Sequence, residues 1–102
     1  MKKHMEEESL KNEDIYKPVL ENEKVRVLKI KIKPGEKTKM HSHPDNVVCI
    51  LSDQKLKFTN SDGEESKFDL SFGQVLYLQP VTHAVENIGE TEGISIVIEL
   101  KK

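Results

Sequence analysis

The sequence predicts an all-β protein whose strands form an antiparallel barrel or sandwich. Two observations carry this prediction: short runs in which apolar and polar residues alternate, and turn-forming residues between those runs. About eight such runs follow one another, and no convincing helical pattern appears outside the charged N-terminal segment. This arrangement favours an antiparallel sheet fold over an α/β fold.

The runs can be followed along the chain from residue 15. In the segment 25–32 the alternation slips at Val27-Leu28, where we expect a β-bulge. Pro34-Gly35 predicts a turn, and the segment 60–63 (NSDG) predicts a hairpin loop because Asp and Gly tolerate a positive φ. Further strands are expected over 47–51, 55–58, 68–70, 75–78, 83–87 and 94–100, the last with one apolar face and half buried.

Length and composition exclude several classes of protein. The chain has 102 residues and a net charge of -2 with interspersed charges, so it holds one modest core and no basic stripe for nucleic acid. We expect a short, flexible charged tail over 1–14 and a single barrel domain over 15–102. One cysteine, no apolar leader and no apolar run of about 20 residues predict a cytoplasmic protein without a membrane segment.

The histidines are the candidate site residues. His41 and His43 are two residues apart, so in a strand both imidazoles point to one face and can chelate one ion. The simpler interpretation is an exposed pair at a strand end. His83 lies in another predicted strand, whereas His4 lies in the tail, where we expect it to be inert.

Two motifs give the histidines a context. Gly35 precedes His41 by five intervening residues, and GEKTKMHSH matches the opening G-x5-H-x-H of the first cupin motif. GQVLYLQPVTHAVEN resembles the second cupin motif through Gly73, Pro80, His83 and Asn87, with a longer Gly-to-Pro spacing and a shortened Pro-to-His spacing. The chain from about residue 19 therefore resembles a small single-domain cupin. The resemblance implies an antiparallel barrel with jelly-roll topology and a divalent metal bound inside it by His41, His43 and His83.

The sequence departs from the cupin pattern at the fourth ligand. Val47 and Val48 stand where the family has a glutamate. Asp45 is a candidate replacement if a turn swings it inward, and otherwise it caps that turn. Glu86 is expected to face away from His83. Three neutral imidazoles suit Zn²⁺, Fe²⁺, Ni²⁺ or Cu²⁺ better than Mn²⁺.

Three further residues are pocket candidates. Cys49 lies near the site if the Val47 face lines the barrel, as a small core residue or a soft ligand. Tyr77 is expected to point inward as core or as a substrate contact. Asn87 shares the His83 face and either orients that histidine or holds a turn.

Three functions remain open from the sequence. The first is an enzyme, a dioxygenase or a lyase or isomerase, that acts on a small organic molecule at the metal. The second is a non-catalytic barrel that binds or senses a metal or small ligand. The third is a metal-free structural barrel. Cupins commonly dimerise, and we expect a homodimer that uses the apolar strand 94–100.

Overall fold

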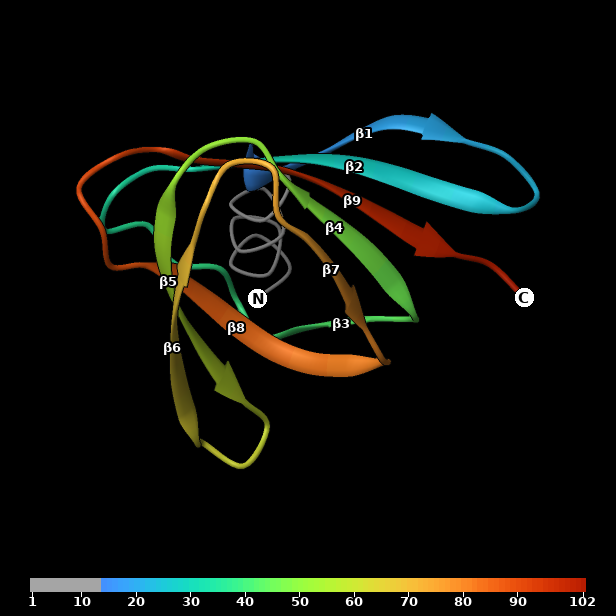
Figure 1. The fold of residues 1–102 in the computed structure, drawn as a ribbon. Helices are drawn as coiled ribbons and strands as arrows, with labels where there is room; N and C mark the ends of the chain where they lie inside the picture. Colours follow the sequence, from blue (N-terminus) through green and yellow to red (C-terminus); the bar gives the residue numbers. More distant parts are fainter. Residues whose placement is uncertain (1–13) are drawn as a thin grey trace.

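The computed structural model of the protein describes residues 14–102, which form nine β-strands. The predicted all-β fold is confirmed, whereas residues 1–13 of the predicted tail lie outside the described residues. In chain order, the strands are β1 (Tyr16–Glu21), β2 (Val25–Ile32), β3 (His41–His43), β4 (Asn46–Ile50), β5 (Gln54–Asn60), β6 (Glu65–Leu70), β7 (Val75–Leu78), β8 (Val81–Asn87) and β9 (Gly93–Leu100) (Figure 1).

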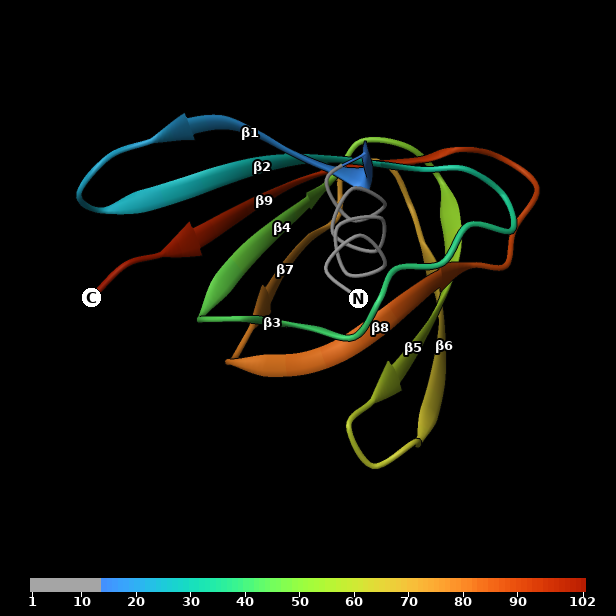
Figure 2. The same ribbon diagram turned by 180° about the vertical axis from the view of Figure 1, so that it is seen from behind.

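The strands form two antiparallel sheets that face each other (Figures 1 and 2). The five-stranded sheet has the order β1-β2-β9-β4-β7, and the four-stranded sheet has the order β3-β8-β5-β6. The chain passes repeatedly from one sheet to the other, so the hydrogen-bonded neighbours β2 and β9 come from opposite ends of the sequence. Among residues 14–102, no helix has the length and apolar character needed to cross a bilayer.

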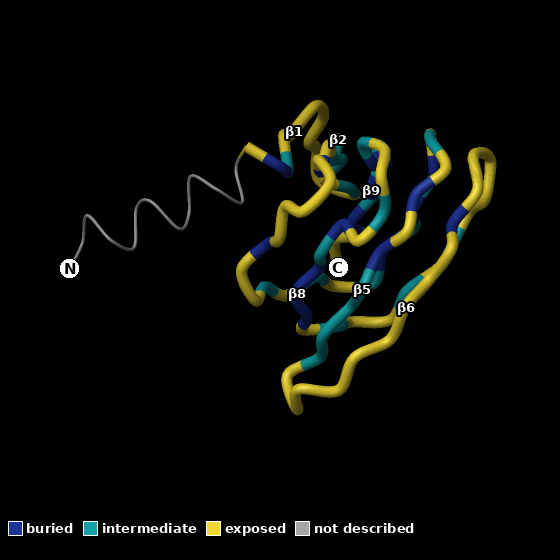
Figure 3. Tube along the Cα trace, turned by 90° about the vertical axis from the view of Figure 1, so that its left-hand side faces the viewer, coloured by how far each residue is buried: buried dark blue, intermediate teal, exposed yellow. Residues whose placement is uncertain are grey.

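The core lies between the inner faces of the two sheets. The strand register places Leu28, Val97 and Val48 side by side across β2, β9 and β4, and all three are buried. The four-stranded sheet contributes Leu56 and Val85 from the other side. Burial of each such side chain stabilises the fold by about 1.5–3 kcal/mol. Figure 3 shows this interior in dark blue, with exposed residues concentrated in the loops, in β1 and in β6.

The predicted turns are confirmed. In the β5–β6 hairpin, the Asn60 Oδ1 accepts hydrogen bonds from the backbone N–H groups of Asp62 and Glu64, at 2.9 and 3.0 Å. Gly63 has a φ of 89°, a conformation that a residue with a Cβ adopts only with strain. The Pro34-Gly35 turn likewise has Gly35 at a φ of 83°.

The predicted bulge lies on a different strand from the one expected. β2 pairs with β9 without a break in register. The irregularity is in β1, between Pro18 and Leu20, whose partners on β2 are Leu28 and Val27. The slip in the β2 alternation therefore lies opposite the bulge, but the extra residue belongs to the neighbouring strand β1.

The structure shows which faces of β4 and β9 line the barrel. Asn46, Val48 and Ile50 face the barrel, so the Val47 face of β4 lies outside. On β9 the inner face carries Ser95, Val97 and Glu99, and the apolar isoleucine face points outward. Because both faces of these strands include apolar residues, alternation alone could not predict which face would be buried in the core.

Candidate metal centre

Three histidines meet at one end of the barrel. His41 and His43 occupy alternate positions of β3, and the register sets His41 directly opposite His83 on β8. One ring nitrogen from each of the three lies within 4.8 Å of the others. The ring centroids of His41 and His83 are 4.9 Å apart, and those of His41 and His43 are 4.8 Å apart. The sequence-based expectation that the three histidines come together therefore agrees with the geometry.

Hydrogen bonds fix which nitrogen each β3 histidine presents. The His41 Nδ1–H donates to the Lys39 carbonyl oxygen at 2.7 Å, and the His43 Nδ1–H donates to the Glu99 Oε2 at 2.6 Å. Because a carbonyl and a carboxylate only accept, both Nδ1 atoms carry the proton. Each Nε2 consequently keeps a lone pair for a metal.

His83 is held by packing. Its ring lies edge-on to Phe58, with centroids 5.0 Å apart, and it is buried at 5% exposure. Within the described part of the chain, no protein group forms a hydrogen bond with either ring nitrogen. A buried imidazole with this arrangement is available as a ligand.

Burial favours the neutral form of His41 and His83. Burial, with smaller contributions from the neighbouring His41 and His43, lowers the pKa of His83 to about 4. Burial also lowers the pKa of His41, and the hydrogen bond that His41 donates to the Lys39 carbonyl opposes this shift. A neutral imidazole is the form that binds metal, so these two groups are ready donors at neutral pH.

Glu99 is the buried carboxylate that the sequence analysis did not assign. It lies on β9, directly between Arg26 on β2 and Asn46 on β4, and it is 7% exposed. Its Oε2 accepts the His43 hydrogen bond, and its Oε1 is 3.7 Å from the Arg26 Nη1. The inward parity that Glu99 shares with Ser95 and Val97 was visible in the sequence. The isoleucines on the other face of β9 were the stronger indication of a buried face.

Tyr16 is the second residue that the sequence analysis missed. This first residue of β1 directs its hydroxyl to the His41 Nε2, at 3.0 Å, and because that nitrogen is unprotonated the phenol donates. Burial, with a smaller contribution from the charge of Glu99, raises the pKa of the Tyr16 phenol. Tyr16 lies outside both histidine motifs, and no pattern in β1 marked it.

Asp45 and Tyr77 lie away from the cluster. The Asp45 carboxylate is 3.6 Å from the Lys102 Nζ and beside Tyr77, so it does not join the histidines as the proposed fourth ligand. Tyr77 is 60% exposed, which corrects the expectation that it points inward. Its strand, β7, is at the edge of the five-stranded sheet and presents Tyr77 outward. Glu86 faces away, as expected, and pairs with Lys57.

Cys49 and Asn87 are also placed by the structure. Cys49 belongs to the outer face of β4, opposite Ile96 and Val75, so it does not line the site. Asn87 is 1% exposed and holds a turn: its Nδ2 donates to the carbonyls of Ile32 and Thr91, and its Oδ1 accepts from the Gly89 N–H. Of the two roles considered for Asn87, its contacts are those of the turn.

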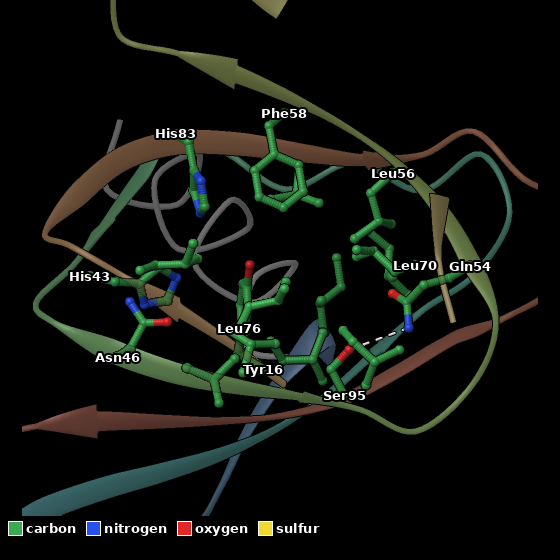
Figure 4. A pocket seen from close by; sticks show the side chains of 18 residues that line it. Tyr16, His43, Asn46, Gln54, Leu56, Phe58, Leu70, Leu76, His83 and Ser95 are labelled. Carbon is green, nitrogen blue, oxygen red and sulfur yellow. Dashed lines mark hydrogen bonds between the residues drawn. The ribbon is translucent and has the colours of Figure 1, made fainter. Parts of the chain in front are cut away.

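Two cavities meet at the site. The inner cavity, of about 60 Å³, runs through the barrel from the Tyr16, His43 and His83 end to Gln54 and Ser95 (Figure 4). The outer cavity, of about 400 Å³, opens beside β3. Its lining combines apolar and polar groups, namely Tyr16, Pro18, Arg26, Leu28, His41, Ser42, His43 and Glu99. Tyr16 and His43 line both cavities and therefore separate the apolar interior from the polar entrance.

The donor set fits a divalent transition metal. Neighbouring ligand atoms around a first-row ion are about 3.0–3.4 Å apart, so shifts on the order of 1 Å would close the three nitrogens onto one ion. Neutral imidazoles suit zinc, iron, nickel and copper. The fold and the cluster together define a two-sheet β-barrel with a three-histidine candidate metal centre at one end.

Comparison with solved structures shows the same fold in cupin proteins. A cupin domain from Bordetella pertussis Tohama I superposes with a TM-score of 0.80 at 29% identity, over 86% of this chain and 93% of that chain. An RmlC-like cupin family protein with a double-stranded β-helix fold, from Methanocaldococcus jannaschii, gives a TM-score of 0.69 at 19% identity, over 85% of this chain and 79% of that chain. No protein-family profile and no curated protein matches the sequence. The chain therefore has the fold of a small single-domain cupin, as its two motifs predicted.

Proposed function

We propose that this cupin domain binds one divalent transition metal through His41, His43 and His83 and acts on a small organic molecule in the outer cavity. The observation that carries the proposal is the convergence of three histidine nitrogens within 4.8 Å at the junction of an apolar and a polar cavity. When bound there, the metal supplies a Lewis acid or an O₂-binding centre.

The residues around the cluster support an enzyme over a storage or structural barrel. Glu99 holds the His43 ring through a 2.6 Å hydrogen bond, so that ligand is oriented before any metal binds. Arg26 is 3.7 Å from Glu99 on one side, and in the described part of the chain its guanidinium has no other ion-pair partner. The guanidinium lines the outer cavity, where it can bind the carboxylate of a small organic acid by donating hydrogen bonds to it.

Metal content tests the first half of the proposal. Protein prepared without an affinity tag is expected to bind one equivalent of zinc or iron, measured by mass spectrometry of the metal. His83→Ala should lose most of it, because two imidazoles remain. His4→Ala is the matched control and should keep full occupancy. An unchanged metal content in His83→Ala would remove this histidine from the site.

Turnover tests the second half. The metal-loaded protein is incubated with small carboxylic acids, thiols, diketones and sugars, and both O₂ consumption and product formation are followed. The proposal expects turnover of at least one acid and none with His83→Ala. Stoichiometric metal binding without turnover of any compound would favour a binding or sensing barrel. Complete indifference to metals would favour a structural one.

We also propose that the protein forms a homodimer through the outer face of the five-stranded sheet. Ile96 and Ile98 of β9 lie beside Cys49 and Val47 of β4, and on the adjoining β7 Tyr77 is 60% exposed. Light scattering after size exclusion should give twice the chain mass. Tyr77→Lys should give a monomer, whereas Lys57→Glu, on the other sheet, should not.

A further inference from the structure

Tyr16 reaches the histidine cluster from a strand that belongs to neither histidine motif. Its hydroxyl oxygen is 3.0 Å from the His41 Nε2, and its ring lies edge-on to both His41 and His43, with centroids 5.1 and 5.8 Å apart. The Nε2 atom that accepts this hydrogen bond is the atom that His41 offers to a metal. A bound metal therefore has to replace the Tyr16 proton at this lone pair.

The position of the Tyr16 oxygen suits a ligand. Adjacent ligand atoms around a first-row ion are about 3.0–3.4 Å apart, since the metal–ligand bonds are about 2.0–2.1 Å long. The oxygen already lies at such a separation from one ligand nitrogen, on the side where the two cavities meet. The Tyr16 oxygen therefore meets the spacing expected of a ligand adjacent to the His41 Nε2.

The charge at the centre also favours an oxygen ligand. Val47 and Val48 replace the carboxylate that would offset one positive charge of a divalent ion. Glu99 does not fill this role directly, because its two oxygens face the His43 Nδ1 and Arg26. Among the residues lining the cavities at the cluster, Tyr16 is the other side chain that can present an anionic oxygen.

We propose that the Tyr16 phenol oxygen is the fourth protein ligand of the metal centre. On binding, the phenol O–H bond breaks, a metal–oxygen bond forms and the proton leaves to solvent through the outer cavity. The centre then has three neutral nitrogens and one anionic oxygen, with the oxygen supplied by β1 instead of β4. This inference rests on the proposed three-histidine site.

Copper(II) is the probe for the test, because a copper–phenolate bond gives a visible charge-transfer band and tyrosinate modes in resonance Raman spectra. One equivalent is added to metal-free protein carrying His4→Ala, which removes the histidine outside the described residues. The chain contains two tyrosines, so Tyr77→Phe is a matched control for Tyr16→Phe. Affinity is measured by competition with a chelator, and circular dichroism checks the fold.

The expected result is a phenolate band in the parent protein and in Tyr77→Phe that is absent from Tyr16→Phe, whose copper affinity falls at least about tenfold. If copper binds and His83→Ala weakens it, but the parent has no phenolate band, Tyr16 is not a ligand and the histidine site stands. Tighter binding to Tyr16→Phe would also overturn the inference, since the hydroxyl would then only compete for His41. If His83→Ala leaves copper binding unchanged, both the inference and the histidine site fail.

Discussion

Replacing Glu99 by glutamine removes the charge that orients His43 while keeping the shape of the side chain. In the structure the His43 Nδ1–H donates to the Glu99 Oε2 at 2.6 Å, and the pair is buried on the inner face of the barrel. A carboxylate in this position strengthens the imidazole as a donor and holds its ring in place. Loss of such a partner weakens metal binding by about 10–100-fold, or roughly 1.4–2.7 kcal/mol.

The assay is a chelator competition that gives the zinc dissociation constant of each variant. Glu86→Gln is the control, because Glu86 pairs with Lys57 on the outside of the barrel, 3.3 Å away. We expect Glu99→Gln to bind zinc at least about tenfold more weakly, with the control unchanged. If both variants bound zinc as tightly as the parent, the assignment of Glu99 as the residue that positions His43 would be refuted.

Three further predictions concern stability and ligand binding. In metal-free protein, the free energy of unfolding should fall by about 1–2 kcal/mol, after allowance for solvent screening, as the pH drops from about 6.5 towards 4. The cause is that the unfolded chain protonates His83 more readily than the folded protein does. Urea titrations in which the unfolding free energies of the parent and of His83→Asn depend equally on pH would contradict this. Asn87→Ala should lose about 3 kcal/mol of stability in thermal unfolding with unchanged zinc affinity, since three hydrogen bonds of the turn disappear, one of them buried and two partly buried. A loss of affinity in the folded variant would instead indicate that Asn87 orients His83. Arg26→Gln should weaken acetate binding to the zinc-loaded protein about tenfold and leave acetamide binding unchanged, and calorimetry showing equal losses for both would exclude charge recognition by Arg26.

The sequence was sufficient to predict the three-histidine cluster because each step rested on a local rule. Alternation within a strand put His41 and His43 on one face. The match to two cupin motifs then related them to His83, which the β3–β8 register places directly opposite His41. The NSDG hairpin followed from turn chemistry in the same way.

The remaining site residues depend on contacts between distant segments. Tyr16 and His41 are 25 residues apart, and His43 and Glu99 are 56 residues apart. Glu99 approaches His43 because β9 inserts between β2 and β4, an order that no local pattern reveals. The inward face of β9 is selected by how both sheets pack, and the isoleucine pattern pointed to the opposite face. The same uncertainty left the placement of Cys49 open and misplaced Tyr77, because their strands can bury either face.

X-ray absorption spectroscopy of the zinc-loaded protein is the decisive test of the three-histidine centre, because it reports the atoms around the metal. We expect three imidazole nitrogens at about 2.0–2.1 Å from the zinc, with oxygen completing the coordination sphere. A sulfur neighbour at about 2.3 Å, which would come from Cys49, or fewer than three imidazoles, would contradict the three-histidine centre.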